Sequence, residues 1–154
     1  TCMRFLVDIA KERASSDWDL LDLGTGTGVI AIAARMLGAH HCEGMDFDPQ
    51  AVKVARRNVR RNQVSLVKMS EVDVLDWHPK RKWPVVVANL FSTILQQAFP
   101  TIVEAMEEKG ELIVSGILHD QWDETQAIAK KSGLHFSQII RKGKWMTARG
   151  THQP

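Results

Sequence analysis

A glycine-rich loop is the feature that most constrains how this chain folds. Segment 22–28 is Asp-Leu-Gly-Thr-Gly-Thr-Gly; it lies between the short apolar run Trp18–Leu23 and an alanine-rich segment that begins at Val29. Glycines at alternate positions let the backbone turn tightly and approach a ligand without a Cβ in the way. The loop also leads into a helix N-terminus, where free N–H groups can meet a carboxylate or phosphate. We therefore expect a strand, a tight ligand-binding loop and a helix in succession.

The rest of the chain continues this alternation of strands and helices. We predict helices at about 3–10, at 29–37, at 49–62, from 92 onward and at 120–132, and strands at 18–23, 41–46, 64–69, 84–88 and 111–115. Pro100 should break or kink the helix that starts at Ser92, and Gly110 should precede the strand at 111–115. Segments 134–140 and 144–149 flank Lys142-Gly143, which predicts an antiparallel hairpin. The pattern indicates an α/β fold: a Rossmann-like, doubly wound, seven-stranded and mostly parallel sheet with a C-terminal antiparallel hairpin.

Length and composition indicate one domain. The 154 residues are 44% hydrophobic, and no repeat or linker interrupts them, so we assign 1–150 to a single domain and 151–154 to a tail. The net charge of +2 does not by itself indicate a nucleic-acid partner. We expect a cytoplasmic protein without a membrane segment. The chain has only two cysteines, it has no signal-peptide pattern, and no apolar run approaches the roughly 20 residues that span a membrane. Because the chain begins without an initiating Met, we expect it to be a fragment.

The spacing within the loop narrows the class of ligand. A dinucleotide fingerprint, Gly-x-Gly-x-x-Gly, requires glycine where this chain has Val29, and the Gly-Lys-Ser/Thr of a P-loop is missing. The next strand ends in Asp46, about 20 residues on, where an acid can accept hydrogen bonds from both hydroxyls of a ribose. Asp48, which precedes Pro49, should instead cap the following helix. A tight turn without a ligand remains the alternative for the loop.

The loop and the acid after the second strand together resemble class I S-adenosylmethionine-dependent methyltransferases, whose loop is acid-x-Gly-x-Gly-x-Gly. The resemblance implies S-adenosylmethionine as cofactor. It implies cofactor-binding roles for Thr1, Asp22, Gly24, Thr25, Gly26, Gly28, Asp46, Phe47, Asp73 and Asn89. The three glycines would line the methionine and ribose part of the cofactor, and Asp46 would hold the ribose. Phe47 would flank the adenine, and Asp73 would lie near the adenine amino group.

Further matches extend from end to end of the chain. They are Thr1-Cys2, Val87-Ala88-Asn89-Leu90, Ser115-Gly116-Ile117-Leu118 and Lys144-Trp145. These segments are similar to the bacterial ribosomal protein L-eleven methyltransferase family, and Thr1-Cys2 resembles the second half of that family's Thr-Thr motif, which helps close the cofactor site. The resemblance implies methyl transfer to amino groups of a ribosomal protein. In that family a separate N-terminal domain, absent from this sequence, holds the substrate.

Asn89 is the catalytic candidate. It ends a strand, which is where ligands bind in open α/β sheets. Many amino-methylating enzymes have Asp/Asn-Pro-Pro-aromatic at this position, where oxygens hold the target nitrogen. Here segment 89–92 is Asn-Leu-Phe-Ser, and the missing prolines argue against a DNA or RNA base as the target. A strand-end cap is the structural alternative for Asn89, and no residue is clearly a general base.

Several other groups of residues indicate ordinary structure. The basic residues of segment 53–61 lie on one helix face, which we interpret as solvated rather than as a groove for RNA: Lys53, Arg56, Arg57, Arg60 and Arg61. We assign no metal to His40, His41 and Cys42, because consecutive strand residues point to opposite faces. Three tryptophans are expected to pack rather than to recognise a ligand: Trp77, Trp83 and Trp122. For Trp145 the resemblance offers a role in recognition as the alternative, but we favour a place in the core.

Three alternatives to a protein methyltransferase remain. The first is a methyltransferase that acts on a small molecule or on RNA. The second is a non-catalytic cofactor-binding domain. The third, a nicotinamide oxidoreductase, is the least favoured because of Val29.

Overall fold

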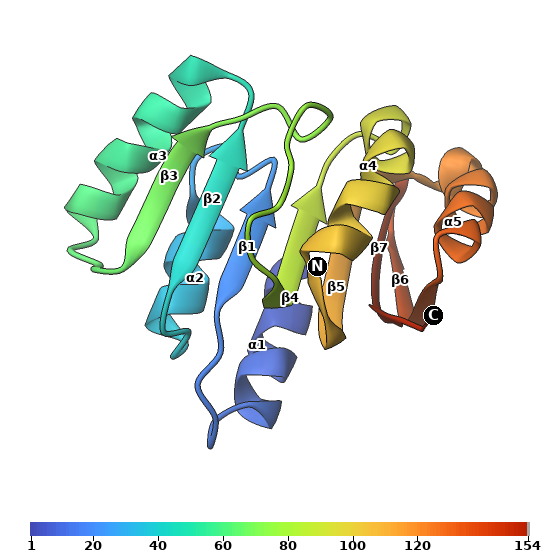
Figure 1. The fold of residues 1–154 in the computed structure, drawn as a ribbon. Coiled ribbons are helices and arrows are strands. Elements are labelled where there is room, and N and C mark those ends of the chain that lie inside the picture. The colour runs from blue at the N-terminus through green and yellow to red at the C-terminus, as the bar shows by residue number, and fades with distance from the viewer. Residues whose placement is uncertain (154) are drawn as a thin grey trace.

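A computed structural model describes residues 1–153 of the chain. They form a seven-stranded sheet of order β3-β2-β1-β4-β5-β7-β6 with helices on both faces (Figure 1). The strands are β1 (Leu20–Leu23), β2 (Cys42–Asp46), β3 (Val67–Glu71), β4 (Trp83–Asn89), β5 (Met106–Leu118), β6 (Leu134–Lys142) and β7 (Trp145–His152). The helices are α1 (Cys2–Glu12), α2 (Val29–Met36), α3 (Pro49–Arg61), α4 (Ser92–Ala105) and α5 (Trp122–Lys131), with a 3-10 turn η1 (His119–Gln121) before α5.

Strand directions confirm the predicted sheet. β1 to β5 run parallel to one another, so their carboxyl ends meet at one edge, at the top in Figure 1. β7 is antiparallel to both β5 and β6. The Rossmann-like, doubly wound sheet with a C-terminal antiparallel hairpin is therefore confirmed.

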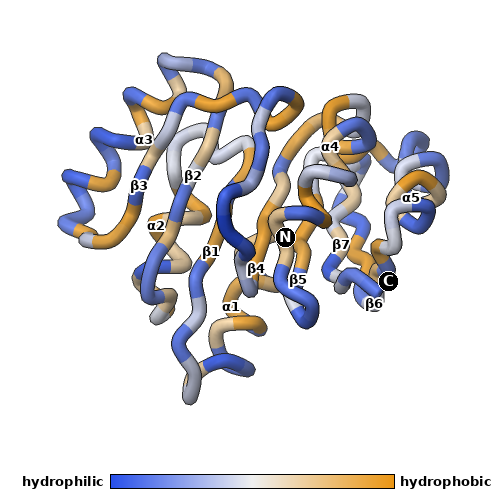
Figure 2. The backbone as a smooth tube through the Cα atoms, in the orientation of Figure 1, coloured by the Kyte–Doolittle hydropathy of each residue, from blue (hydrophilic) through white to orange (hydrophobic). Residues whose placement is uncertain are grey.

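A hydrophobic core lies on each face of the sheet. Successive side chains of a strand point to opposite faces. Leu21 and Val86 accordingly pack with α4 and α5, whereas Leu20 and Val85 pack with α1, α2 and α3. Figure 2 shows hydrophobic residues along the central strand β4, which lies between the two cores. None of the helices within residues 1–153 is both long enough and apolar enough to span a membrane.

Helix α3 has the predicted cap and the predicted exposed face. The Asp48 carboxylate accepts a hydrogen bond from the Gln50 N–H at 2.8 Å, and Pro49 is the first helical residue. Val52 and Ala55 are the buried residues of α3, and its basic residues are exposed. The helix is accordingly mainly hydrophilic in Figure 2, and its basic face is exposed.

Helix α4 runs through Pro100, so the prediction of a helix break there is wrong. Pro100 itself is exposed, whereas Ala98, Phe99 and Ile102 around it are fully buried. A proline removes one backbone hydrogen bond of the helix. Burial of the apolar face, at about 25 cal/mol per Å², outweighs that loss.

Several strand boundaries also differ from the predictions. β3 begins at Val67 rather than at residue 64, because Gln63 and Leu66 have φ of 53° and 61°, which no strand residue adopts. β5 begins before Gly110, which lies at an irregularity of the β4–β5 pairing; a Cβ there would lie 2.9 Å from the Glu107 carbonyl oxygen. β7 extends to His152, which takes residues 151 and 152 out of the predicted tail. Residue 154 lies outside the described residues.

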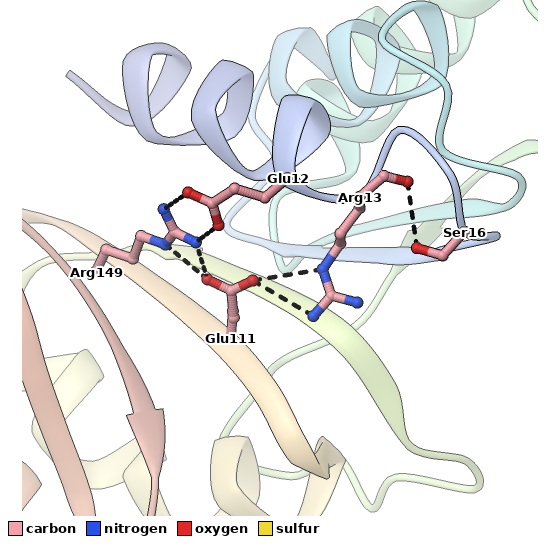
Figure 3. A network of polar contacts seen from close by, with 5 residues as sticks. All are labelled: Glu12, Arg13, Ser16, Glu111 and Arg149. Carbon is pink, nitrogen blue, oxygen red and sulfur yellow. Dashed lines mark hydrogen bonds and ion pairs between the residues drawn. The ribbon is translucent and has the colours of Figure 1, made fainter.

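A charged network fastens α1 to the sheet (Figure 3). Arg149 on β7 donates from Nε to Glu111 on β5 at 2.6 Å and through both terminal nitrogens to Glu12 at the end of α1. Arg13 donates to the other oxygen of Glu111 at 3.3 Å. The hydrogen bonds to Glu12 raise the pKa of Arg149, and the same contact lowers the pKa of Glu12. The network holds the C-terminal end of α1, while the start of α1 reaches the carboxyl edge of the sheet.

Candidate active site

The glycine loop after β1 is tied to the end of β2. The N–H groups of Gly24 and Thr25 both donate to the Met45 carbonyl oxygen at 2.9 Å. Gly24 and Gly26 have φ of 73° and 55°, a region that glycine adopts without strain. A Cβ on Gly24 would lie 2.8 Å from the carbonyl oxygen of Asn89, whereas a Cβ on Gly26 would meet nothing within 4 Å. Gly26 therefore borders open space in which a ligand can approach the backbone.

Asp46 joins this loop to the end of β2. Its Oδ2 accepts from the Gly26 N–H at 2.9 Å, and its Oδ1 accepts from the Asp48 N–H at 3.0 Å. Each carboxylate oxygen has a further lone pair for another donor. The carboxylate can therefore hold the loop and accept hydrogen bonds from two neighbouring hydroxyls of a ligand.

A cavity of about 560 Å³, here called the first cavity, opens beside these groups at the carboxyl edge of the sheet. Five of the predicted cofactor-binding residues line it: Gly24, Asp46, Phe47, Asp73 and Asn89. The Phe47 side chain is 72% exposed, so its ring is free to cover a ligand. Asp73 uses Oδ1 to accept from the Leu75 N–H at 2.9 Å. A mostly apolar cavity with a few directed polar groups is typical of a small-molecule site.

The first cavity also has walls that the motifs did not indicate. They include Val72, Val74, Leu90, Phe91 and Ile94. Apolar residues of this kind carry no sequence signature. Of these residues, Phe91 could have been predicted from the sequence, because it is an aromatic residue two positions after Asn89. Its side chain is 73% exposed.

Trp145 was expected in the core, and that prediction is wrong. It is 40% exposed and lines the first cavity. It is the first residue of β7 and pairs with Leu118, the last residue of β5, so it lies at the carboxyl edge rather than beneath a helix. The other four tryptophans behave differently: Trp18, Trp83 and Trp122 are buried, and Trp77 packs against the core.

A second cavity, of about 400 Å³, adjoins the first. The start of α1 and the β6–β7 hairpin line it, with Thr1, Cys2, Met3, Lys142 and Thr147, and it shares Asn89, Ser115 and Trp145 with the first cavity. Asn89 and Ser115 are register partners at the ends of β4 and β5. The hydroxyls of Ser115 and Thr147 are 3.0 Å apart. Asn89 therefore stands where the two cavities meet.

Four predicted cofactor-binding residues line neither cavity: Asp22, Thr25, Gly26 and Gly28. Asp22 and Thr25 are buried, and the Thr25 hydroxyl donates to Asp22 Oδ2 at 2.6 Å. Gly28 caps α2, and a Cβ there would lie 2.9 Å from the Met69 methyl carbon. Asp22, Thr25 and Gly28 thus support the loop in this structure, and their cofactor-binding roles stay predictions. Gly26 lies at its open surface.

Asp22 is a buried acid beneath the loop. Desolvation raises its pKa to about 6, and the charge of Asp46 acts in the same direction, against the Thr25 hydroxyl and the Ala31 N–H. Its Oδ1 has no partner with hydrogen-bond geometry within residues 1–153. The loop thus rests on a carboxyl group that is largely neutral in mildly acidic solution.

His41 and Cys42 serve packing, whereas His40 is exposed. The His41 ring stacks on buried Trp83, with ring centroids 6.0 Å apart, and Cys42 is buried. In the described part of the chain, no three His, Cys, Asp or Glu side chains are grouped in a way that could hold a metal ion.

The sheet order, the glycine loop after β1 and the acid at the end of β2 together define the class I methyltransferase fold. Within that class, the chain belongs to the ribosomal protein L11 methyltransferase (PrmA) family, whose model matches residues 1–153.

Individual relatives agree with this assignment. The chain is 35% identical over 139 residues to the ribosomal protein L11 methyltransferase of Caldanaerobacter subterraneus subsp. tengcongensis, an alignment that covers 90% of this chain and 42% of the relative. It is 33% identical over 154 residues to the enzyme of the same name from Xanthomonas oryzae pv. oryzae, covering 99% of this chain and 48% of the relative. The chain thus spans about half the length of these relatives.

A crystal structure shows the same architecture. The ribosomal protein L11 methylase of Lactobacillus delbrueckii subsp. bulgaricus superposes with a TM-score of 0.86 at 25% sequence identity. The match covers 97% of this chain and 78% of that one.

Proposed function

We propose that this chain is the catalytic domain of an S-adenosylmethionine-dependent methyltransferase that modifies amino groups of a ribosomal protein in the cytoplasm. The observation that carries the proposal is the Asp46 carboxylate, bonded to the Gly26 N–H beside an apolar cavity that reaches Asn89. Family membership supports the acceptor, because the relatives bear the name ribosomal protein L11 methyltransferase.

The residues of the first cavity fit the parts of this cofactor. Asp46 retains lone pairs for the ribose hydroxyls, and the glycines beside it leave the backbone open to approach. Phe47 and Val74 would flank the adenine, and Asp73 would accept from its amino group. Thr1, at the wall of the second cavity, would help close the site.

The cofactor supplies an electrophilic methyl group on a sulfonium sulfur, so the protein chiefly has to position the acceptor nitrogen and exclude water. The Asn89 amide oxygen, at the junction of the cavities, can accept a hydrogen bond from the incoming amine and direct its lone pair. The paired hydroxyls of Ser115 and Thr147 offer further acceptors on the same side. The amine reacts in its neutral form, so its ammonium must first release a proton to water.

Calorimetric titration tests the cofactor assignment. S-adenosylmethionine and its demethylated product S-adenosylhomocysteine should bind, and NAD⁺ should bind far more weakly, because the loop has Val29 where a dinucleotide fingerprint has its third glycine. Tighter binding of NAD⁺ would contradict the proposal.

Asn89→Ala tests the catalytic assignment. We expect this variant to bind S-adenosylhomocysteine within a few-fold of wild type yet to transfer methyl about 100-fold more slowly, because misplacing the acceptor by about 1 Å has an effect of that order. The assay is single-turnover transfer from labelled cofactor to ribosomal protein L11. Asn62→Ala is the matched control, since Asn62 caps α3 at its C-terminal end and lines neither cavity. Full activity of Asn89→Ala would remove this residue from the site, and rapid turnover of a small metabolite would contradict a protein acceptor.

A further inference from the structure

Lys142 is one of the residues that line the second cavity. It is the last residue of β6 and pairs with Trp145 across the hairpin turn. Directly paired residues of an antiparallel ladder point to the same face of the sheet. Trp145 lines both cavities, so Lys142 lies on the side of the sheet where they meet.

The second cavity contains the groups that an amine needs for reaction. Asn89 lines this cavity together with Lys142 and also lines the first cavity, where the methyl donor would bind. The Ser115 and Thr147 hydroxyls, 3.0 Å apart, supply lone pairs that can accept N–H hydrogens. Lys142 itself is exposed, so its ammonium can release a proton to solvent.

The neighbouring lysine of the hairpin is differently placed. The Nζ of Lys144 lies 5.4 Å from the centroid of the Trp145 ring, a cation–π contact. Lys144 lines neither cavity. The chain therefore offers a matched pair of lysines on one turn, one in the cavity wall and one outside it.

We propose that Lys142 is an internal methyl acceptor, so that the protein methylates itself at this residue. The inference rests on the proposed function. The neutral Nζ lone pair forms a bond to the methyl carbon of S-adenosylmethionine while the carbon–sulfur bond breaks. The bonding electron pair stays on sulfur and yields S-adenosylhomocysteine. The products are N-methyl-lysine at position 142, which is protonated as an ammonium, and the proton that the original ammonium released to water.

Self-methylation has a functional consequence. A lysine that lies in the acceptor cavity competes with the external amine for the same oxygens. Methylation preserves the positive charge of Lys142 but adds bulk and removes an N–H donor. The modified residue should therefore leave the cavity to the protein substrate more readily.

Peptide mapping by mass spectrometry tests the inference. The purified chain incubated with labelled S-adenosylmethionine should acquire one or more methyl groups on Lys142. The fraction of chains labelled per unit time should not change with protein concentration, because the step is intramolecular. Lys142→Arg should lower the rate of self-labelling at least about 10-fold, whereas Lys144→Arg should retain it. Methylation confined to residues other than Lys142, or a labelled fraction per unit time that rises with protein concentration, would overturn the inference.

A second readout does not depend on methyl transfer. Acetylation of lysines by a water-soluble acylating reagent, followed residue by residue, should slow at Lys142 when S-adenosylhomocysteine is present and remain unchanged at Lys144. Equal reactivity of Lys142 with and without S-adenosylhomocysteine would contradict its place beside the donor. A chain that methylates ribosomal protein L11 but leaves Lys142 unmodified overturns this inference and retains the proposed function. A chain that does not bind S-adenosylhomocysteine overturns both.

Discussion

Replacement of Asp46 is the most direct test of the site, because this carboxylate joins the glycine loop to the end of β2. Asp46→Ala removes the hydrogen bonds to the N–H groups of Gly26 and Asp48, 2.9 and 3.0 Å long, and the proposed bonds to the ribose. The two backbone hydrogen bonds are absent from the variant both with and without cofactor, so their loss lowers the free energy of unfolding. The ribose contacts are lost only from the complex. A hydrogen bond to a charged acceptor contributes about 1.5–3 kcal/mol, so the dissociation constant of the cofactor should rise about 10- to 100-fold.

The assay is calorimetric titration with S-adenosylhomocysteine, with urea unfolding of each variant measured in parallel. Asp48→Ala is the matched control: Asp48 caps α3 by accepting from the Gln50 N–H at 2.8 Å, and it lines neither cavity. Its loss should lower the free energy of unfolding by about 1 kcal/mol and leave cofactor affinity within a few-fold. The ribose assignment is refuted if Asp46→Ala binds normally, or if both variants lose affinity equally.

Three further predictions concern the loop, the buried acid and the network. Gly26→Val should abolish cofactor binding and leave the circular dichroism spectrum unchanged, because φ is 55° at Gly26 and the space beside it is open to the ligand. The control variant Gly38→Val, where φ is 104° and the surroundings are equally open, should still bind the cofactor. Binding by both variants would mean that the loop is a simple turn. The pKa of Asp22 is about 6 in the folded protein, above its value of about 3.9 in the unfolded chain. The neutral carboxyl group therefore stabilises the fold fully below about pH 4, and the free energy of unfolding should fall by about 2–3 kcal/mol as the pH rises through about 6. Urea unfolding of Asp22→Asn should show no such loss, and parallel pH profiles of wild type and variant would refute the assignment. Arg149→Met should lower the free energy of unfolding by about 2–4 kcal/mol, because it leaves the Glu111 carboxylate, only 14% exposed, without its main cation. Arg13→Met should cost less than about 1 kcal/mol, and equal losses in urea would contradict the central role of Arg149.

Local chemistry explains what could be predicted from the sequence. The glycine loop, the acid at the end of the second strand and the Asp48-Pro49 helix start each depend on residues only a few positions apart. The alternation of strands and helices likewise follows from the spacing of apolar residues along the chain, and it predicted the seven-stranded sheet correctly. Local rules failed where packing opposes them. Pro100 lies inside α4 because the residues around it are buried, and β3 starts late because two residues before it have positive φ.

The walls of the site depend on the sheet order. Asn89, Ser115, Lys142 and Trp145 come from four different strands, and no spacing along the chain relates them. They meet because the parallel β4 and β5 end at the same edge, and because β7 inserts between β5 and β6 in the opposite direction and so begins at that edge. The sequence by itself therefore determined the fold class and the cofactor motifs, which are local. The tertiary structure decided which apolar and hydroxyl side chains complete the two cavities, because pairing between distant strands brings together residues that no local pattern connects.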